Sequence, residues 1–489
     1  MDLEFNIESK KENSNSKEKE NKLITDYSKF FSLRNTTPVQ VTPIELKSFV
    51  VSKDYYQFGA GVPSHLFFPI KGLKFQFQYV DETIEIEEDN LGTLQQYSQL
   101  PGFPKLIEWL RELQKRYHGL DSYDTEGKEW DILLTTGSQQ GLDVMFKVFL
   151  DRNDSLLTER YSYGGMFALS QPFGVNTIGI EMDDRGVIPD QLQYVLKNWC
   201  TLHRDKKFPK ALYVIPHGQN PTGIIYDLER KREIYNICRE WDLLIIEDDP
   251  HFFLQFENPM NEKGHRILEK SFLKIDTDDR VVRLDTFSKF LSSGIRMGII
   301  TCSKKLMPIF NLEVTCAIFH PSGLTQAMLE ALFLRWGYEG FENHVKRVQD
   351  ILIQKRKDAI ENIEKHLKGL VTYRVPNSGL YLWLKLNNVD CSLTFIRDIV
   401  FPRNVLFGLG ISHSPDRNVK SPYIRVTFSY LEKEDGDVAF KILGDCLRSL
   451  NGNNNIDQDK KTVSVNDKSS SSKPHQPLIL QLQFHQQIR

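Results

Sequence analysis

Short apolar runs alternate with helical patterns through the middle of the chain. The runs typical of strands are residues 132–136 (ILLTT), 211–215 (ALYVI), 243–247 (LLIIE), 281–285 (VVRLD) and 298–302 (GIITC). Their nearly continuous hydrophobicity is typical of strands buried on both faces, as in a largely parallel sheet. Between them, residues 228–241 repeat apolar side chains at helical spacing after Asp227, a residue type that caps helices. The alternation predicts an α/β domain over residues 90–340.

The pattern changes after about residue 340. A long helical stretch at 340–367 is followed by the strand-like segments 371–375 (VTYRV), 379–386 (GLYLWLKL) and 423–429 (YIRVTFS). A closing helix is expected near residues 432–450. These elements predict a smaller α+β domain over residues 341–452.

Both ends of the chain are polar. Residues 9–22 (SKKENSNSKEKENK) contain no apolar side chain, and the residues after about 450 are rich in Asn, Asp, Lys and Ser. Such segments bury too little apolar surface to offset the entropy of ordering, so residues 1–24 and 453–489 are expected to be a disordered head and a low-complexity tail. Within the tail, residues 477–484 (PLILQLQF) either dock on the body or a partner, or stay unstructured.

The composition excludes several classes of function. The 489 residues carry 62 Lys+Arg and 65 Asp+Glu, a net charge of −3, which argues against a dedicated nucleic-acid-binding protein. The six cysteines are scattered, without a CxxC pair or zinc-ligand spacing, so no metal site is predicted and a reducing compartment is favoured. The sequence shows no secretory signal, transit peptide or apolar run of about 18 residues, so we expect a cytoplasmic protein with no membrane partner.

Three loops that follow predicted strands carry polar side chains where open α/β sheets bind ligands. GSQQG at 137–141 opens a helix, so its amides and the Ser138 hydroxyl could hold a phosphate, or it is an ordinary strand–helix turn. PHGQNPTG at 216–223 surrounds Asn220, which either starts a turn or fixes a ligand. EDDP at 247–250 places acidic side chains either in solvent or in the ligand crevice.

A fourth loop, DTFSKFLSSGIRMG at 285–298, makes the pattern specific. It places Lys289 after a buried strand and Arg296 seven residues further on. A buried lysine tends to lose its proton and become a nucleophilic amine. An arginine can bind phosphate through two hydrogen bonds. A Ser-Lys pair alone has no specificity, whereas the four loops in this order are highly specific.

With these motifs the chain resembles the class I/II aminotransferases of fold type I, which use pyridoxal phosphate. It looks most like their aromatic, kynurenine and 2-aminoadipate branch, from about residue 58 to residue 428. The resemblance implies that residues 90–340 form the cofactor-binding domain and 341–452 the small domain. It also implies that residues 25–89 contribute to the small domain and the substrate site, and that the protein is a homodimer with shared active sites.

The resemblance implies a role for residues of each motif. Lys289 matches the lysine that binds the cofactor as a Schiff base and moves the proton at Cα, and Asp248 matches the carboxylate that keeps the pyridine nitrogen protonated. Asn220 matches an amide that contacts the phenolic oxygen of the cofactor and the substrate. The remaining matches are Ser138, Gln139, Thr286, Ser288 and Arg296 around the phosphate, Tyr163 stacked on the pyridine, Tyr97 at the neighbouring subunit's phosphate, and Arg425 and Gly61 at the substrate.

Two features depart from the pattern of the branch. His251 stands where the family usually has a tyrosine that donates to the phenolic oxygen, and imidazole titrates near neutrality. It is either a structural histidine or a cofactor-binding donor. The loop at 401–422 lacks the LFxPG pattern that borders the substrate site. Tyr163 and Tyr97 also have plainer alternatives, as a packed core ring and a surface ring.

The implied reaction is a ping-pong transamination between an aromatic amino acid, kynurenine or 2-aminoadipate and a 2-oxo acid, with 2-oxoglutarate expected as acceptor. Another pyridoxal-phosphate-dependent reaction on an amino acid, such as that of a lyase, is the alternative. A regulator that binds pyridoxal phosphate is a remote one, because the polar head is too short for a helix-turn-helix.

Overall fold

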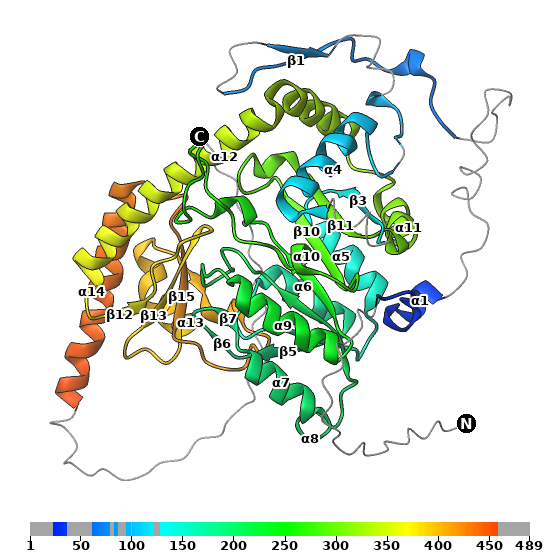
Figure 1. Cartoon of the computed structure of the whole chain (residues 1–489). Helices are drawn as coiled ribbons and strands as arrows, with labels where there is room; N and C mark the ends of the chain where they lie inside the picture. The colour runs from blue at the N-terminus through cyan, green and yellow to red at the C-terminus, as the bar shows by residue number, and fades with distance from the viewer. Residues whose placement is uncertain are drawn as a thin grey trace, which may run out of the picture.

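The structure, a computed structural model, describes residues 23–36, 61–78, 83–86, 94–98, 100–120 and 128–457 (Figure 1). Residues 1–22 of the predicted head and most of the predicted tail, including 477–484, lie outside these residues. Ile24, which was assigned to the disordered head, is buried, and its N–H donates to the Asp278 carbonyl at 2.9 Å. An apolar side chain directly after the polar run is therefore anchored on the body.

A seven-stranded sheet with the order β3-β11-β10-β9-β8-β4-β5 forms the centre of the larger part of the molecule. Its strands are β3 (Trp130–Thr135), β4 (Ser155–Glu159), β5 (Asn176–Ile180), β8 (Pro209–Val214), β9 (Leu244–Asp248), β10 (Val281–Thr286) and β11 (Gly298–Ser303). β10, β9, β8, β4 and β5 are parallel, while β11 runs antiparallel to both β10 and β3. The predicted mostly parallel α/β sheet is confirmed.

Side chains that alternate along these strands enter two different hydrophobic clusters. Leu156, Tyr213 and Ile246 pack in one cluster, and their strand neighbours Leu157 and Ile245 pack in the other. The first cluster is covered by α5 (Ser138–Phe149), α6 (Gly164–Phe173) and α11 (Met307–Ile318), and the second by α7 (Pro189–Lys197), α8 (Trp199–Leu202), α9 (Leu228–Glu240) and α10 (Phe272–Ile275). Both faces of the sheet are thus covered, which explains why its central strands β8, β9, β10 and β11 are rich in apolar residues.

The predicted helix caps are present. α9 begins after Asp227, whose side chain accepts a hydrogen bond from the Arg230 N–H at 2.9 Å. α4 (Pro104–His118) buries an apolar face made of Leu106, Ile107, Leu110 and Leu113. None of the helices in the described ranges is long and apolar enough to cross a bilayer.

A second, four-stranded antiparallel sheet has the order β12-β13-β15-β14. Its strands are β12 (Val371–Tyr373), β13 (Tyr381–Leu386), β14 (Gly408–Leu409) and β15 (Tyr423–Thr427). The long helix α12 (Gly323–Leu367) breaks at Gly337, and its C-terminal part packs beside α14 (Lys433–Asp457), as Figure 1 shows. α14 extends beyond the predicted end of the small domain at residue 452.

The described N-terminal residues pack on the larger part of the molecule. Tyr27 and Phe30 are buried in the cluster that α5 covers, and Ser32 N–H donates to the Val148 carbonyl at 2.7 Å. Because these contacts are with α5 and its sheet, the prediction that residues 25–89 contribute to the small domain is wrong for this portion. β1 (Leu73–Phe75) and β2 (Ile84–Ile86) pair only with each other and lie away from both sheets (Figure 1).

Candidate active site

The loops that follow β3, β8, β9 and β10 surround one cavity. Its polar lining consists of Ser138, Gln139, Tyr163, Asn220, Asp248, His251, Thr286, Ser288, Lys289, Arg296 and Tyr381. All but Tyr381 were predicted. The convergence follows from topology, because the carboxyl ends of neighbouring parallel strands meet at one edge of the sheet.

One end of the cavity is built to receive an anion. α5 begins at Ser138 after Gly137, and Ser138 and Gln139 of its first turn line the cavity. Arg296 Nη1 lies 3.2 Å from Ser288 Oγ, and its Nη2 donates to the Thr136 carbonyl at 3.2 Å. Ser288 Oγ in turn lies 2.9 Å from Thr286 Oγ1. A guanidinium, two hydroxyls and a helix N-terminus together suit a phosphate.

Asp248 provides an unpaired acceptor inside the same cavity. Tyr213 donates to its Oδ2 at 2.6 Å, whereas Oδ1 is buried without a hydrogen-bond partner. Burial, followed by the negative charges of Asp249 and Asp285, raises the pKa of Asp248 to about 6, although the Tyr213 hydrogen bond lowers it. A buried carboxylate oxygen with no partner fits a protonated ring nitrogen.

Lys289 belongs to the lining of the same cavity. Burial, followed by the positive charges of Arg425 and Arg296, lowers the pKa of Lys289. The lowered pKa raises the fraction of neutral amine near neutral pH. The side chain is therefore suited to act as a nucleophile and as a proton acceptor.

Arg425 reaches the cavity from β15 of the second sheet. Its Nη1 donates to Asn220 Oδ1 at 2.9 Å, and its guanidinium stacks 4.3 Å from the centre of the Tyr381 ring. Its Nε is buried without a partner. The arginine is thus oriented but retains free hydrogen-bonding capacity, as binding of a carboxylate requires.

His251 is buried against the edge of Tyr381, with the ring centres 5.7 Å apart, and neither ring nitrogen has a hydrogen-bond partner. Burial, followed by the positive charge of Lys289, lowers the pKa of His251 to about 3. The imidazole is therefore neutral across the physiological range. The ordinary pKa of a solvated histidine therefore does not apply to this buried ring.

Tyr97 and Gly61 do not reach this cavity within one chain. Tyr97 is 55% exposed and packs on Phe319, with ring centres 5.5 Å apart. Gly61 is exposed, and no heavy atom lies within 4 Å of the position that a Cβ would take. Tyr163, by contrast, lines the cavity as predicted.

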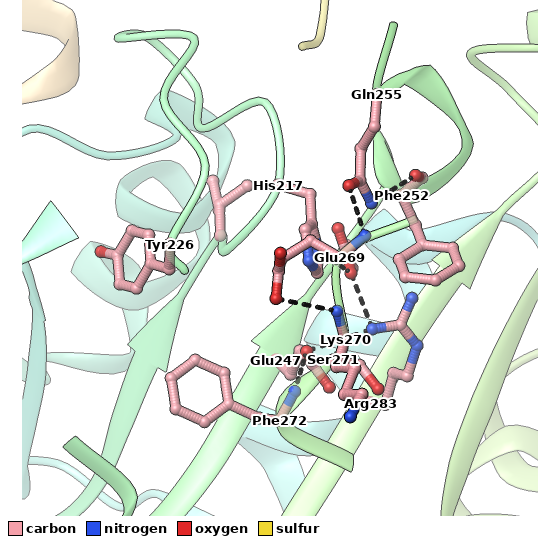
Figure 2. A network of polar contacts seen from close by, with 12 residues as sticks. His217, Tyr226, Glu247, Phe252, Gln255, Glu269, Lys270, Ser271, Phe272 and Arg283 are labelled. Atoms are coloured by element: carbon pink, nitrogen blue, oxygen red, sulfur yellow. Dashed lines mark hydrogen bonds and ion pairs between the residues drawn. The ribbon is translucent and has the colours of Figure 1, made fainter. Parts of the chain in front are cut away.

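A buried network of ionic contacts lies next to the loops that follow β8 and β9. Sequence reasoning did not find it. Arg283 Nη1 contacts Asp249 at 2.7 Å and Glu247 at 3.2 Å, and His217 Nδ1 lies 2.7 Å from the same Asp249 oxygen. Lys231 Nζ lies 2.9 Å from His217 Nε2. Figure 2 shows Arg283, Glu247 and His217 facing one another from neighbouring elements. His217, Glu247 and Asp249 are close enough to suit a metal ion, but Arg283 already forms ion pairs with both carboxylates.

A second buried carboxylate, Glu159, anchors the loop that carries Asn220. It accepts hydrogen bonds from the Ile215 N–H at 3.1 Å and from the Tyr226 hydroxyl and the Gln219 amide at 2.8 Å each. Neither this role nor the ionic network is visible in the sequence, since the partners are brought together from segments far apart in the chain. The acidic residue at the end of SLLTE was the one available signal.

Comparison with known proteins identifies the family. A family model described as aminotransferase class I and II matches residues 75–438. The chain belongs to this family. It is 55% identical over 443 residues to an aromatic amino acid aminotransferase of Dictyostelium discoideum, covering 90% of this chain and 92% of that protein. It is 34% identical over 434 residues to the mitochondrial kynurenine/alpha-aminoadipate aminotransferase of Rattus norvegicus, covering 87% of this chain and 100% of that protein.

Among solved structures, an aminotransferase from Candida albicans superposes with a TM-score of 0.77 at 23% identity, over 88% of this chain and 100% of that chain, which shows the shared fold. The family and fold type predicted from the motifs are thus confirmed. The protein described here uses pyridoxal phosphate, the cofactor of the class I and II aminotransferases. The anion-binding end and the unpaired Asp248 Oδ1 fit the phosphate and the ring nitrogen of that cofactor.

Proposed function

We propose that the protein transfers the amino group of an aromatic amino acid to a 2-oxo acid, with 2-oxoglutarate as the acceptor, in a ping-pong reaction. The observation that carries the proposal is that Lys289 lines both the cavity that holds the unpaired Asp248 Oδ1 and the adjoining groove that holds the incompletely paired Arg425. The high identity to an aromatic amino acid aminotransferase supports the donor class. The kynurenine/alpha-aminoadipate relatives support kynurenine and 2-aminoadipate as further donors.

Each residue contributes a separate action. Arg425 holds the substrate α-carboxylate through its fork of donors, in an orientation that Asn220 and Tyr381 maintain. The amine of Lys289, whose pKa is lowered, accepts the proton that leaves Cα. It donates this proton again in a later step of the reaction. Asp248 Oδ1, which is buried without a partner, would accept a hydrogen bond from the protonated ring nitrogen of the cofactor. Bound pyridoxal phosphate supplies an electron sink for the negative charge that develops at Cα.

The groove next to Lys289 and Arg425 supports large apolar side chains as substrates. It has a volume of about 1100 Å³, and its apolar lining comes from α12, β13, α14 and the loop before β14: Val348, Leu352, Leu380, Val405, Leu406, Phe407 and Ile442. An aromatic ring placed here loses contact with water and gains apolar contacts. This groove includes the part of loop 401–422 that departs from the branch pattern.

We further propose a homodimer in which Tyr97 and the segment around Gly61 complete the partner's active site. Their exposure in the single chain supports this arrangement. We also propose a cytoplasmic location, which the six unpaired cysteines support. Localisation of the tagged protein by microscopy tests the second point.

Spectroscopic titration tests the donor class without a coupling enzyme. The purified protein with pyridoxal phosphate is expected to absorb visible light, and phenylalanine, tyrosine, tryptophan or kynurenine should bleach that absorption and release the matching 2-oxo acid. Absence of a visible band after addition of the cofactor would refute the proposal. A band that only small aliphatic amino acids bleach would refute the aromatic donor class alone.

A further inference from the structure

Tyr213 makes a contact that none of the predicted site residues provides. It lies within β8, fully buried, and its hydroxyl donates to Asp248 Oδ2 on the neighbouring strand β9 at 2.6 Å. In the parallel register Tyr213 is opposite Ile246, so Asp248 is the next residue on the same face of β9. The tyrosine side chain is long enough to reach from its position opposite Ile246 to the carboxylate of Asp248.

The contact makes the two carboxylate oxygens of Asp248 unequal. Burial, together with the charge of Asp248, raises the pKa of Tyr213 well above its ordinary value, so the phenol keeps its proton and acts only as a donor toward Asp248. Oδ2 must then be the acceptor, and a proton on Asp248 could sit only on Oδ1. Such a proton would turn the free acceptor in the cavity into a donor.

Other charges around Asp248 act in opposite directions. Asp249, the residue directly after β9, and Asp285 on β10 favour its protonated form, while Lys289 favours its ionised form. The ring of Tyr163 also lines this part of the cavity. In this set, Tyr213 supplies the one hydrogen bond that the structure shows to the Asp248 side chain among the described residues.

We propose that Tyr213 is a positioning residue for the transamination: it orients Asp248 and keeps it ionised, so that Oδ1 remains a free acceptor for the protonated ring nitrogen of the cofactor. The proposal rests on the proposed function for the identity of that nitrogen. Tyr213 itself touches neither cofactor nor substrate, since it is absent from the lining of the cavity and acts through Asp248.

The Tyr213→Phe variant tests the proposal because it removes one oxygen and keeps the ring. We expect the pH below which the apoprotein loses affinity for pyridoxal phosphate to rise by about one unit, the size of a hydrogen bond to a charged group. An analogue of the cofactor with carbon in place of the ring nitrogen should bind the variant and the wild type equally. kcat should fall about tenfold while KM for the amino acid changes little, because Arg425 is unaltered.

The Tyr235→Phe variant is the matched control. Tyr235 is also buried and donates to a carboxylate, Asp276 Oδ1 at 2.8 Å, but outside the cavity. It should leave the pH dependence of cofactor binding unchanged. The proposal would be overturned if the pH midpoint of cofactor binding did not shift in Tyr213→Phe. It would also be overturned if the variant lost affinity equally for pyridoxal phosphate and for the carbon analogue, and Tyr213 would then have only a structural role.

The Asp248→Asn background covers the case in which packing changes obscure the first result. There, the additional Tyr213→Phe change should no longer alter the ratio of affinities for pyridoxal phosphate and its analogue. A persisting effect would contradict action through Asp248. If the wild type itself fails to transaminate, the proposed function fails; if only these variants behave unexpectedly, the role of Tyr213 alone fails.

Discussion

Arg425 is held in place at one end of its guanidinium and left without a partner at Nε. The Arg425→Ala variant should lose about 2–5 kcal/mol of transition-state stabilisation, because the substrate carboxylate is then buried without its partner. Steady-state kcat/KM for both the amino acid and the 2-oxo acid measures this loss. Arg397→Ala is the control, since Arg397 is exposed, pairs with its neighbour Asp398 and lines neither the cavity nor the groove. An unchanged KM in Arg425→Ala would contradict the assigned role.

Lys289 is the residue whose loss should be most severe. The Lys289→Ala variant lacks the amine that acts on both the cofactor and Cα, so kcat should fall by several orders of magnitude. Borohydride reduction should fix the cofactor covalently to residue 289 in the wild type and to no residue of the variant. Mass spectrometry locates the attachment. Near-normal turnover in Lys289→Ala would exclude the covalent role.

Glu159 gives the stability of the apoprotein a dependence on pH. Burial raises the pKa of Glu159 to about 7, above its ordinary value of 4.5, although its four donors oppose the shift. The folded chain therefore holds this proton more tightly than the unfolded chain. The resulting stabilisation is complete below about pH 4.5 and is lost as the pH rises through about 7, which amounts to roughly 3 kcal/mol.

The Glu159→Gln variant isolates this contribution because it cannot titrate. Urea unfolding of both apoproteins at pH 5 and pH 7.5 should show the advantage of the wild type over the variant shrinking at the higher pH. A constant difference between the two pH values would mean that Glu159 is ionised throughout.

At the scale of elements, the residues of the site can be predicted from the sequence more completely than the strands of the sheet that carries them. The apolar runs of β3, β8, β9, β10 and β11 are visible, whereas β4 and β5 are not. β4 has only two apolar residues, and most of β5 is only partly buried, so neither shows a strong period. β4 pairs with β8 and β5 pairs with β4, and β5 also packs against α6 and α7, contacts that no local pattern encodes.

The same limit explains which site residues sequence reasoning missed. Asp248, Asn220 and Lys289 follow strands, so topology alone brings them together. Tyr213 lies inside the run ALYVI, where it reads as one more core ring, and only strand register gives its hydroxyl a partner. Tyr381 comes from the second sheet, whose position against the first depends on contacts between loops.

One such contact between loops joins Gly218 to Gly379. Gly218 has φ +54°, and a Cβ there would lie 2.6 Å from the Gly379 Cα. Gly218→Ala should therefore cost about 2–4 kcal/mol, from left-handed strain and from the clash together. Gly369→Ala is the control, with φ +76° and no heavy atom within 4 Å of the new Cβ, and should cost only about 1–2 kcal/mol.

Chemical unfolding of these two variants measures the difference. Since Gly218 lies beside Asn220, the same change should also raise KM for the amino acid. Equal losses of stability in the two alanine variants would show that the loops separate without cost.

At the scale of the whole molecule, large apolar side chains are exposed on the side that carries Tyr97. Leu66 is 81% and Phe67 75% exposed, and Tyr97 and Phe319 line a groove close to them. Exposed apolar surface of this kind is typical of an interface between subunits. Leu66→Asp combined with Phe67→Asp should therefore shift the protein from dimer to monomer in analytical ultracentrifugation, while Leu202→Asp, an exposed apolar residue on α8, should not.

Mixing of subunits tests whether the dimer shares its active sites. Lys289→Ala subunits retain Tyr97, and Tyr97→Ala subunits retain Lys289, so each parent dimer should have two impaired sites. In a hybrid dimer with shared sites, one site receives both native residues. Random exchange of equal amounts should then restore about a quarter of wild-type activity. If each chain instead completes its own site, the mixture will not exceed the average of its two parents, and Tyr97 will be a surface ring with no catalytic partner.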